Sequence, residues 1–151
     1  MNPSPSVPPV SRPPASDLLA SPVISDQDVL DRVAAIIDPA PRRHRTLWLF
    51  FLDAAGSQAN LVVPIDDVPE RPAAAMVSNV CYIASEALTQ CEPGGSVVIT
   101  LSRPGTATLT DSDRHFLRAL QHGASTHATS VRMLCLATTA GIRELGPVSP
   151  G

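Results

Sequence analysis

The sequence predicts a single α/β domain in which a mixed β-sheet is flanked by helices. Short, strongly apolar segments alternate with segments whose apolar residues recur at helical spacing, which is typical of α/β folds. Two adjacent apolar segments are joined by a turn that contains Gly56, and this pattern predicts a hairpin with antiparallel strands. We therefore expect the element order α-β-β-α-β-α-β-β.

The domain is expected to span residues 23–146, with a tail on either side. Residues 1–22 are rich in proline and poor in large apolar side chains, so their burial cannot offset the entropy lost on ordering. We predict a disordered tail there, although its Pro-Pro pairs also allow docking in an aromatic groove as a polyproline II helix. Residues 147–151 form a short C-terminal tail.

The first half of the domain begins with a helix and continues with the hairpin. Ser25 and Asp28 resemble a capping box ahead of apolar residues at helical spacing, and this helix should end before Pro39. Residues 47–53 (LWLFFLD) are almost all apolar, which predicts a central strand covered on both faces. A second strand is expected at residues 58–65.

The second half alternates helices and strands. A helix is predicted from Ala73 until the breaker Pro93-Gly94-Gly95, because its apolar residues recur every three or four positions. The remaining elements are a strand at 96–102, a helix from Asp111 to about Gly123, and strands at 131–137 and 142–145.

Composition excludes several classes of protein. The net charge of -3 gives no basic field for phosphate backbones, so nucleic acid is an unlikely partner. No apolar stretch approaches the roughly 20 residues of a membrane span, and we expect a cytoplasmic protein. All 11 basic residues are arginine, which indicates a GC-rich, actinobacterial genome. The three cysteines, Cys81, Cys91 and Cys135, lack metal-binding spacing and are expected to be buried free thiols.

The loop between residues 102 and 113 resembles a known metal site. The pattern of the RadC-like branch of the JAB/MPN metalloprotease family is His-x-His-Pro-Ser-Gly, a short spacer and Ser-x-x-Asp. In this chain Leu101 and Arg103 stand at the histidine positions, and a Pro-Gly pair follows. Thr110 and Asp113 keep the ending after a spacer one residue shorter. The resemblance covers about residues 25–145, includes the apolar strand that ends in Leu-Asp, and implies the same order of elements.

The resemblance also implies what the loop has lost. In the family, two histidines and the aspartate bind the metal, and an upstream glutamate moves the proton. Leu101 cannot coordinate a metal, and Arg103 places a permanent positive charge where the metal should lie. The segment where the glutamate would be sought, residues 41–45, reads Pro-Arg-Arg-His-Arg. We therefore expect no metal and no cofactor, and a vestigial cleft formed by Leu101, Arg103, Thr110 and Asp113.

Other candidate residues have simpler interpretations. Asp113 either caps the helix only or also pairs with Arg103 where the metal used to be. His115, His122 and His127 lack paired metal-ligand spacing and are expected to be solvated. The chain has no Gly-x-Ser-x-Gly motif and no phosphate-binding loop, and the basic run at residues 42–45 is expected to be a solvated turn.

Two functions are compatible with the sequence. The first is a non-catalytic interaction or scaffold module that binds a protein partner through the old cleft or a sheet edge. The alternative is a small-ligand-binding protein or a divergent hydrolase that reuses the cleft, with Arg103, Thr110 and Asp113 as polar contacts.

Overall fold

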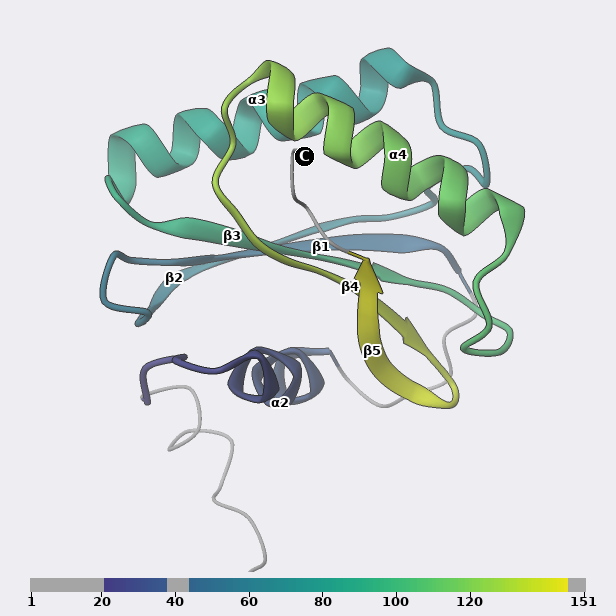
Figure 1. Ribbon diagram of the computed structural model, residues 1–151, viewed down its shortest axis with the longest axis horizontal. Coiled ribbons are helices and arrows are strands. Elements are labelled where there is room, and N and C mark those ends of the chain that lie inside the picture. The colour runs from purple at the N-terminus through teal and green to yellow at the C-terminus, as the bar shows by residue number, and fades with distance from the viewer. Residues whose placement is uncertain (1–20, 38–43, 147–151) are drawn as a thin grey trace, which may run out of the picture.

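The structure, a computed structural model, describes residues 21–37 and 44–146 (Figure 1). Most of the two predicted tails lies outside these residues, as do Arg42 and Arg43. The end of the N-terminal tail is described, however, and it contacts the domain. The carbonyl of Ser21 accepts a hydrogen bond from the Arg32 side chain. Ordered contacts with the domain thus begin before residue 23.

Within the described residues, three helices and five strands follow one another in the predicted order α-β-β-α-β-α-β-β. They are α2 (Asp26–Ile36), β1 (Thr46–Leu52), β2 (Gln58–Ile65), α3 (Ala74–Cys91), β3 (Ser96–Ser102), α4 (Asp111–Thr126), β4 (Val131–Thr138) and β5 (Gly141–Gly146).

The prediction that α4 ends near Gly123 was wrong. Gly123 lies inside the helix and at its crossing with α3, where a Cβ atom would come within 3.0 Å of Cys81 Sγ. The glycine therefore allows close packing of two helices, and the helix continues to Thr126.

The five strands form one mixed sheet in the order β2-β1-β3-β4-β5. Strand β1 is antiparallel to both β2 and β3, β3 is parallel to β4, and β4 is antiparallel to β5. The predicted α/β class and mixed sheet are confirmed.

The helices form one layer on each face of the sheet. Helices α3 and α4 cover one face and α2 lies against the other (Figure 1). Alternating residues of β1 serve the two cores, with Leu49 and Phe51 facing the α3–α4 layer and Phe50 and Leu52 facing α2. The prediction that this strand is covered on both faces is confirmed. Full burial of each large apolar side chain contributes about 1.5–3 kcal/mol.

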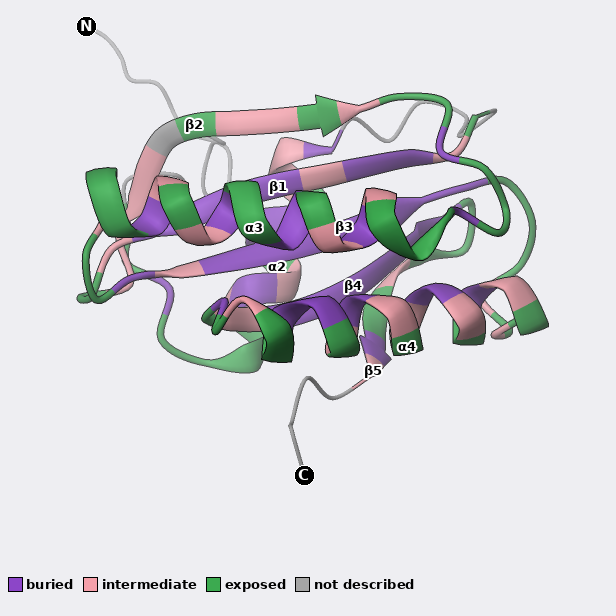
Figure 2. Ribbon diagram, turned by 90° about the horizontal axis from the view of Figure 1, so that it is seen from above, coloured by how far each residue is buried: buried purple, intermediate pink, exposed green. Residues whose placement is uncertain are grey.

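The edge of the sheet is less well covered. Figure 2 shows β2 with intermediate and exposed residues, while β1 beside it and β3 on the far side of β1 are largely buried. No helix among the described residues is long and apolar enough to cross a membrane.

Candidate functional site

The first turn of α4 is fixed by a reciprocal capping box. Thr110 is the N-cap, and its hydroxyl oxygen accepts a hydrogen bond of 3.1 Å from the amide of Asp113. The Asp113 carboxylate in turn accepts one of 2.9 Å from the amide of Thr110. The predicted capping role of Asp113 is confirmed, and the cap sets the position of its carboxylate.

The same carboxylate forms a buried, bidentate ion pair with Arg103. Arg103 Nε lies 2.9 Å from Asp113 Oδ1, and Arg103 Nη2 lies 2.6 Å from Asp113 Oδ2. The relative exposure of the two residues is only 4% and 0%. Capping and ion pairing therefore occur together at the Asp113 carboxylate.

The remaining donors of Arg103 hold the loop that follows β3. Arg103 Nη1 donates to the carbonyl of Pro104 and Nη2 to the carbonyl of Thr108. Gly105 has a φ of +100°, and a Cβ atom at this position would come within 3.0 Å of Arg103 Nη1. Glycine is thus required both by the left-handed backbone and by the guanidinium beside it.

The ion pair determines the protonation state of Asp113. Burial alone would raise the pKa of this carboxyl group, because the charged form loses its hydration. Hydrogen bonds from Arg103 and from the Thr110 amide outweigh that effect and hold the pKa below its ordinary value. Asp113 is therefore a carboxylate with both oxygens occupied, which suits a structural counter-ion better than a general base.

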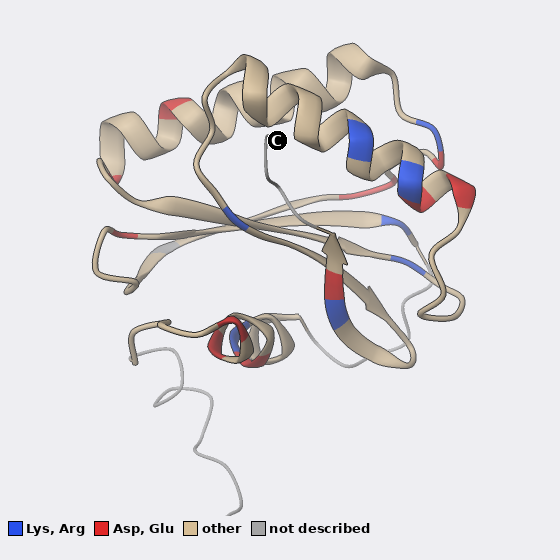
Figure 3. Cartoon of the chain, viewed as in Figure 1, with Lys and Arg blue, Asp and Glu red and all other residues tan. Residues whose placement is uncertain are grey.

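A cavity of about 460 Å³ lies next to this pair. Its lining comes from the residue before β1, the segment before α3, the loop after β3 and the first turn of α4. The lining residues are Arg45, Glu70, Arg103, Pro104, Gly105, Thr106, Thr110, Asp111 and Ser112. In Figure 3 charged segments gather at this end of the molecule, near the ends of β1 and β3 and along the first turns of α4.

The cavity includes only part of the predicted cleft. Arg103 and Thr110 line it, whereas Asp113 is fully buried behind Arg103. The placement of Leu101 in the cleft was wrong, because its apolar side chain is buried in the core beneath α3 and α4. Leu101 is therefore a core residue and takes no part in the cavity.

Arg45 is the residue that sequence reasoning missed. It belongs to the basic run that was predicted to be a solvated turn, yet it is partly buried and lines the cavity. Its Nε and Nη2 atoms are buried and find no hydrogen-bond partner among the described residues. Burial lowers the pKa of this guanidinium, while the charges of Asp113 and Glu70 act in the opposite direction. Arg45 thus contributes a positively charged side chain to the lining of the cavity.

A metal site is not found in the part of the chain that the structure describes. No three His, Cys, Asp or Glu side chains there lie close enough together to hold an ion. Comparisons with family models, curated proteins and solved structures found no match to this chain.

His127 is only partly exposed and its ring is hydrogen-bonded, which corrects the expectation of a solvated histidine. Its Nε2 atom lies 2.8 Å from the Ser78 hydroxyl, and its ring makes an edge contact with Tyr82 at 5.6 Å. Its carbonyl accepts a hydrogen bond from Ser85. No carboxylate among the described residues bonds to the ring to orient it for catalysis, so the Ser–His contact fastens α4 to α3. The contact joins residues 49 positions apart, and motif searches along the chain do not detect it.

The cysteines also differ from one another. Cys81 and Cys135 are buried as expected, and burial raises their pKa values to about 11 and about 12. Cys91 is exposed at the end of α3, contrary to the expectation that all three are buried. Neither buried thiol is a candidate nucleophile, because the thiolate is the reactive form.

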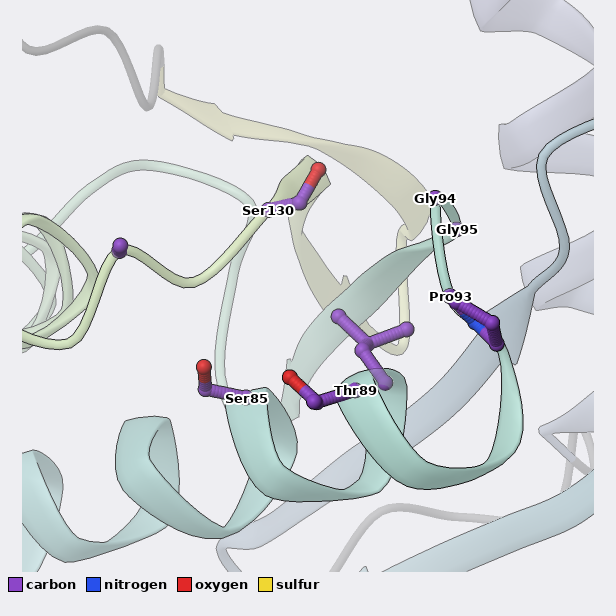
Figure 4. Close-up of a pocket in the computed structure, with 8 residues that line it drawn as sticks. Ser85, Thr89, Pro93, Gly94, Gly95 and Ser130 are labelled. Carbon is purple, nitrogen blue, oxygen red and sulfur yellow. The ribbon is translucent and has the colours of Figure 1, made fainter.

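A second pocket, of about 340 Å³, lies at the opposite end of α3 (Figure 4). Its lining is Ser85, Leu88, Thr89, Pro93, Gly94, Gly95, Ala128 and Ser130. The polar side chains around it are hydroxyl groups, and none of the lining residues is charged. This pocket has hydrogen-bonding capacity but no acid, base or metal ligand.

Proposed function

We propose that the protein is a metal-free, non-catalytic relative of the RadC-like JAB/MPN domains, and that it binds a protein partner. The observation that carries the proposal is the buried pair between Arg103 and Asp113. The order of the elements, which agrees with the order implied by the resemblance, supports it further.

The ion pair argues against metal chemistry at this site. Both oxygens of Asp113 already accept hydrogen bonds, and a cation would have to displace a guanidinium bound in two places. A catalytic zinc requires about three protein ligands. Arg103 repels a cation and Leu101 lies in the core, so the loop supplies at most one ligand.

The edge of the sheet beside α3 supports a role in protein binding. Four large apolar side chains of the described residues are exposed, and three of them lie on β2 and α3. Leu61 is 45% exposed and Ile83 53%; these two residues define the β2–α3 surface. Tyr82 is 48% exposed and lies on the side of α3 that faces α4, where its ring contacts His127. Strand β2 has no charged residue, and α3 has Glu86 alone among its 18 residues. Depletion of charge around exposed apolar and aromatic side chains is typical of interface cores.

Metal analysis tests the non-catalytic half of the proposal. Protein purified without chelators should contain no stoichiometric zinc, and EDTA should leave its melting temperature unchanged. Peptide and isopeptide substrates should not be cleaved. Stoichiometric zinc that survives dialysis, together with a melting temperature lowered by EDTA, would contradict a metal-free domain.

Replacement of single exposed residues tests the partner-binding half. Wild-type protein and the variants Leu61→Asp and Ile83→Asp serve as baits in the source cell, and captured proteins are quantified by mass spectrometry. A specific partner should be lost from both variants, because a charge in an apolar interface is costly to desolvate. Ile24→Asp is the matched control, since it makes the same change at an exposed apolar residue outside this surface. Equal loss with Ile24→Asp, or retention by Ile83→Asp, would contradict the assignment of the surface.

A further inference from the structure

We propose that the cavity beside α4 binds a carboxylate group through Arg45. This inference is independent of the β2–α3 surface and concerns a different set of residues. The two arginines that line the cavity, Arg45 and Arg103, differ in how many hydrogen-bond acceptors surround them.

Arg103 has little capacity left for a ligand, because four of its five N–H groups already donate within the protein. Its Nε, Nη1 and Nη2 atoms all donate to acceptors within the protein, and the charge of Asp113 balances its own. An anion that entered the cavity would find this guanidinium already neutralised. Arg103 therefore forms the wall of the cavity without attracting an anion.

Arg45 is in the opposite situation. Its guanidinium is partly buried, two of its nitrogen atoms lack an acceptor among the described residues, and no carboxylate there lies within ion-pair distance. Removing a charge from water without a partner is unfavourable. An anion in the cavity would supply the missing counter-charge, so its binding offsets a cost already present in the folded protein.

Other groups in the lining can complete the binding of an anion. The cavity also contains the hydroxyl groups of Thr106 and Thr110. Asp111 and Ser112 occupy the first two positions of α4, where backbone N–H groups have no acceptor within the helix. These donors lie close to the positive end of the helix dipole and add to the attraction by Arg45.

The acidic residues of the lining select the type of anion. Glu70 and Asp111 also border the cavity, and their charges oppose a doubly charged phosphate. A carboxylate carries a single negative charge, which matches the single positive charge of the Arg45 guanidinium. At about 460 Å³ the cavity also has the size of a small-molecule site rather than of a single ion. The carboxylate should thus belong to a small organic acid or to the C-terminus of a peptide.

Glu70 should weaken this binding. It is exposed, its charge acts on Arg45, and its carboxylate receives only a long hydrogen bond of 3.4 Å from Ser112. A ligand carboxylate has to compete with this negative charge for Arg45. Removal of the charge by Glu70→Gln should therefore strengthen binding, while loss of the Arg45 charge should weaken it.

Calorimetric titration of the full chain tests the inference, with N-acetylglycine as the small carboxylate and N-acetylglycinamide as its neutral counterpart. The acid should bind saturably and the amide should not. Arg45→Gln should weaken binding at least about tenfold, the value of one charge-assisted pair, and Glu70→Gln should tighten it several-fold. Arg118→Gln removes the same charge from an exposed position of α4 outside the cavity and should leave binding unchanged.

Two further probes identify the source of the carboxylate. Tighter binding of a tripeptide with a free C-terminus than of N-acetylglycine indicates a peptide terminus, and equal binding indicates a small acid. Inorganic phosphate that binds more tightly than either would overturn the choice of a carboxylate. The absence of saturable binding by any of the acids, or unchanged binding in a folded Arg45→Gln variant, would overturn the site.

Discussion

Arg103 and Arg45 line the same cavity, yet their surroundings give them different roles. Arg103 is buried against Asp113, and all three of its nitrogen atoms donate hydrogen bonds within the protein. Arg45 is partly buried, and its Nε and Nη2 atoms have no acceptor among the described residues. The two side chains are therefore distinguished by how many of their N–H groups already have acceptors within the protein. Arg103 has a structural role, whereas Arg45 can still bind a ligand.

The difference follows from the position of each arginine relative to the strands and helices. Arg103 lies directly after β3 and ten residues before Asp113, so one side chain joins the strand, the loop and the first turn of α4. Arg45 lies directly before β1, and the contact that fixes its backbone is the hydrogen bond from the Val68 amide to its carbonyl. The backbone is anchored in both cases, but only Arg103 has a buried counter-ion.

The largest effect is expected from breaking the Arg103–Asp113 pair. Arg103→Met keeps an unbranched side chain but leaves the Asp113 carboxylate buried without its counter-ion, and we expect a loss of about 3–5 kcal/mol in the free energy of unfolding. Arg45→Met is the matched variant. It removes a buried charge that has no ion-pair partner among the described residues, so it should cost little or should stabilise the protein. Urea denaturation measures both.

A double variant distinguishes loss of the pair from loss of packing. Arg103→Met combined with Asp113→Asn removes both charges and keeps an oxygen that can accept the Thr110 amide. This variant should recover a large part of the stability lost in Arg103→Met, because no charge remains buried and unpaired. Equal losses in Arg103→Met and Arg45→Met would contradict the distinction between the two arginines.

The fold was largely predictable because local signals specify its elements. The apolar run of β1, the capping boxes at Ser25 and Thr110, and the turn at Gly56 each act within a few residues of sequence. The end of α4 was not predictable in this way. Gly123 resembles a helix terminator in the sequence, but its contact with Cys81 on α3 keeps it inside the helix.

The part of the cavity formed by Arg103 could be predicted because its signals are also local in sequence. The pairing of Arg103 with Asp113 follows from the spacing of a loop and a helix cap. Arg45 reaches the cavity only through long-range strand pairing. Thr46 is opposite Ser102 in the antiparallel pair of β1 and β3, and this register brings the neighbouring residues Arg45 and Arg103 to the same end of the sheet. Register of this kind is a property of the folded sheet and cannot be read from the residues around position 45.

A smaller effect is expected in the pH dependence of the free energy of unfolding. The pKa of Asp113 in the folded protein lies below the ordinary value of about 4 that applies to the unfolded chain, because the bonds from Arg103 and Thr110 outweigh the effect of burial. A lowered folded-state pKa means that the unfolded state binds the proton more tightly. The stability contributed by Asp113 is therefore fully present above pH 4 or so, and it is lost as the pH falls through the folded pKa.

The pH dependence of the free energy of unfolding should distinguish Arg103 from Arg45, whatever the absolute stability of each variant. Unfolding free energies measured from about pH 6 to the lowest pH at which the protein folds should fall more steeply for the wild type than for Asp113→Asn. The difference between these two curves isolates Asp113 from other carboxyl groups, such as Asp28, whose pKa is lowered by the amides of Ser25 and Ile24. Arg45→Met should retain the wild-type slope, because Arg103 still holds the carboxylate. A slope in Arg45→Met as shallow as that of Asp113→Asn would mean that both arginines stabilise Asp113 equally, and that Arg45 already has its counter-ion.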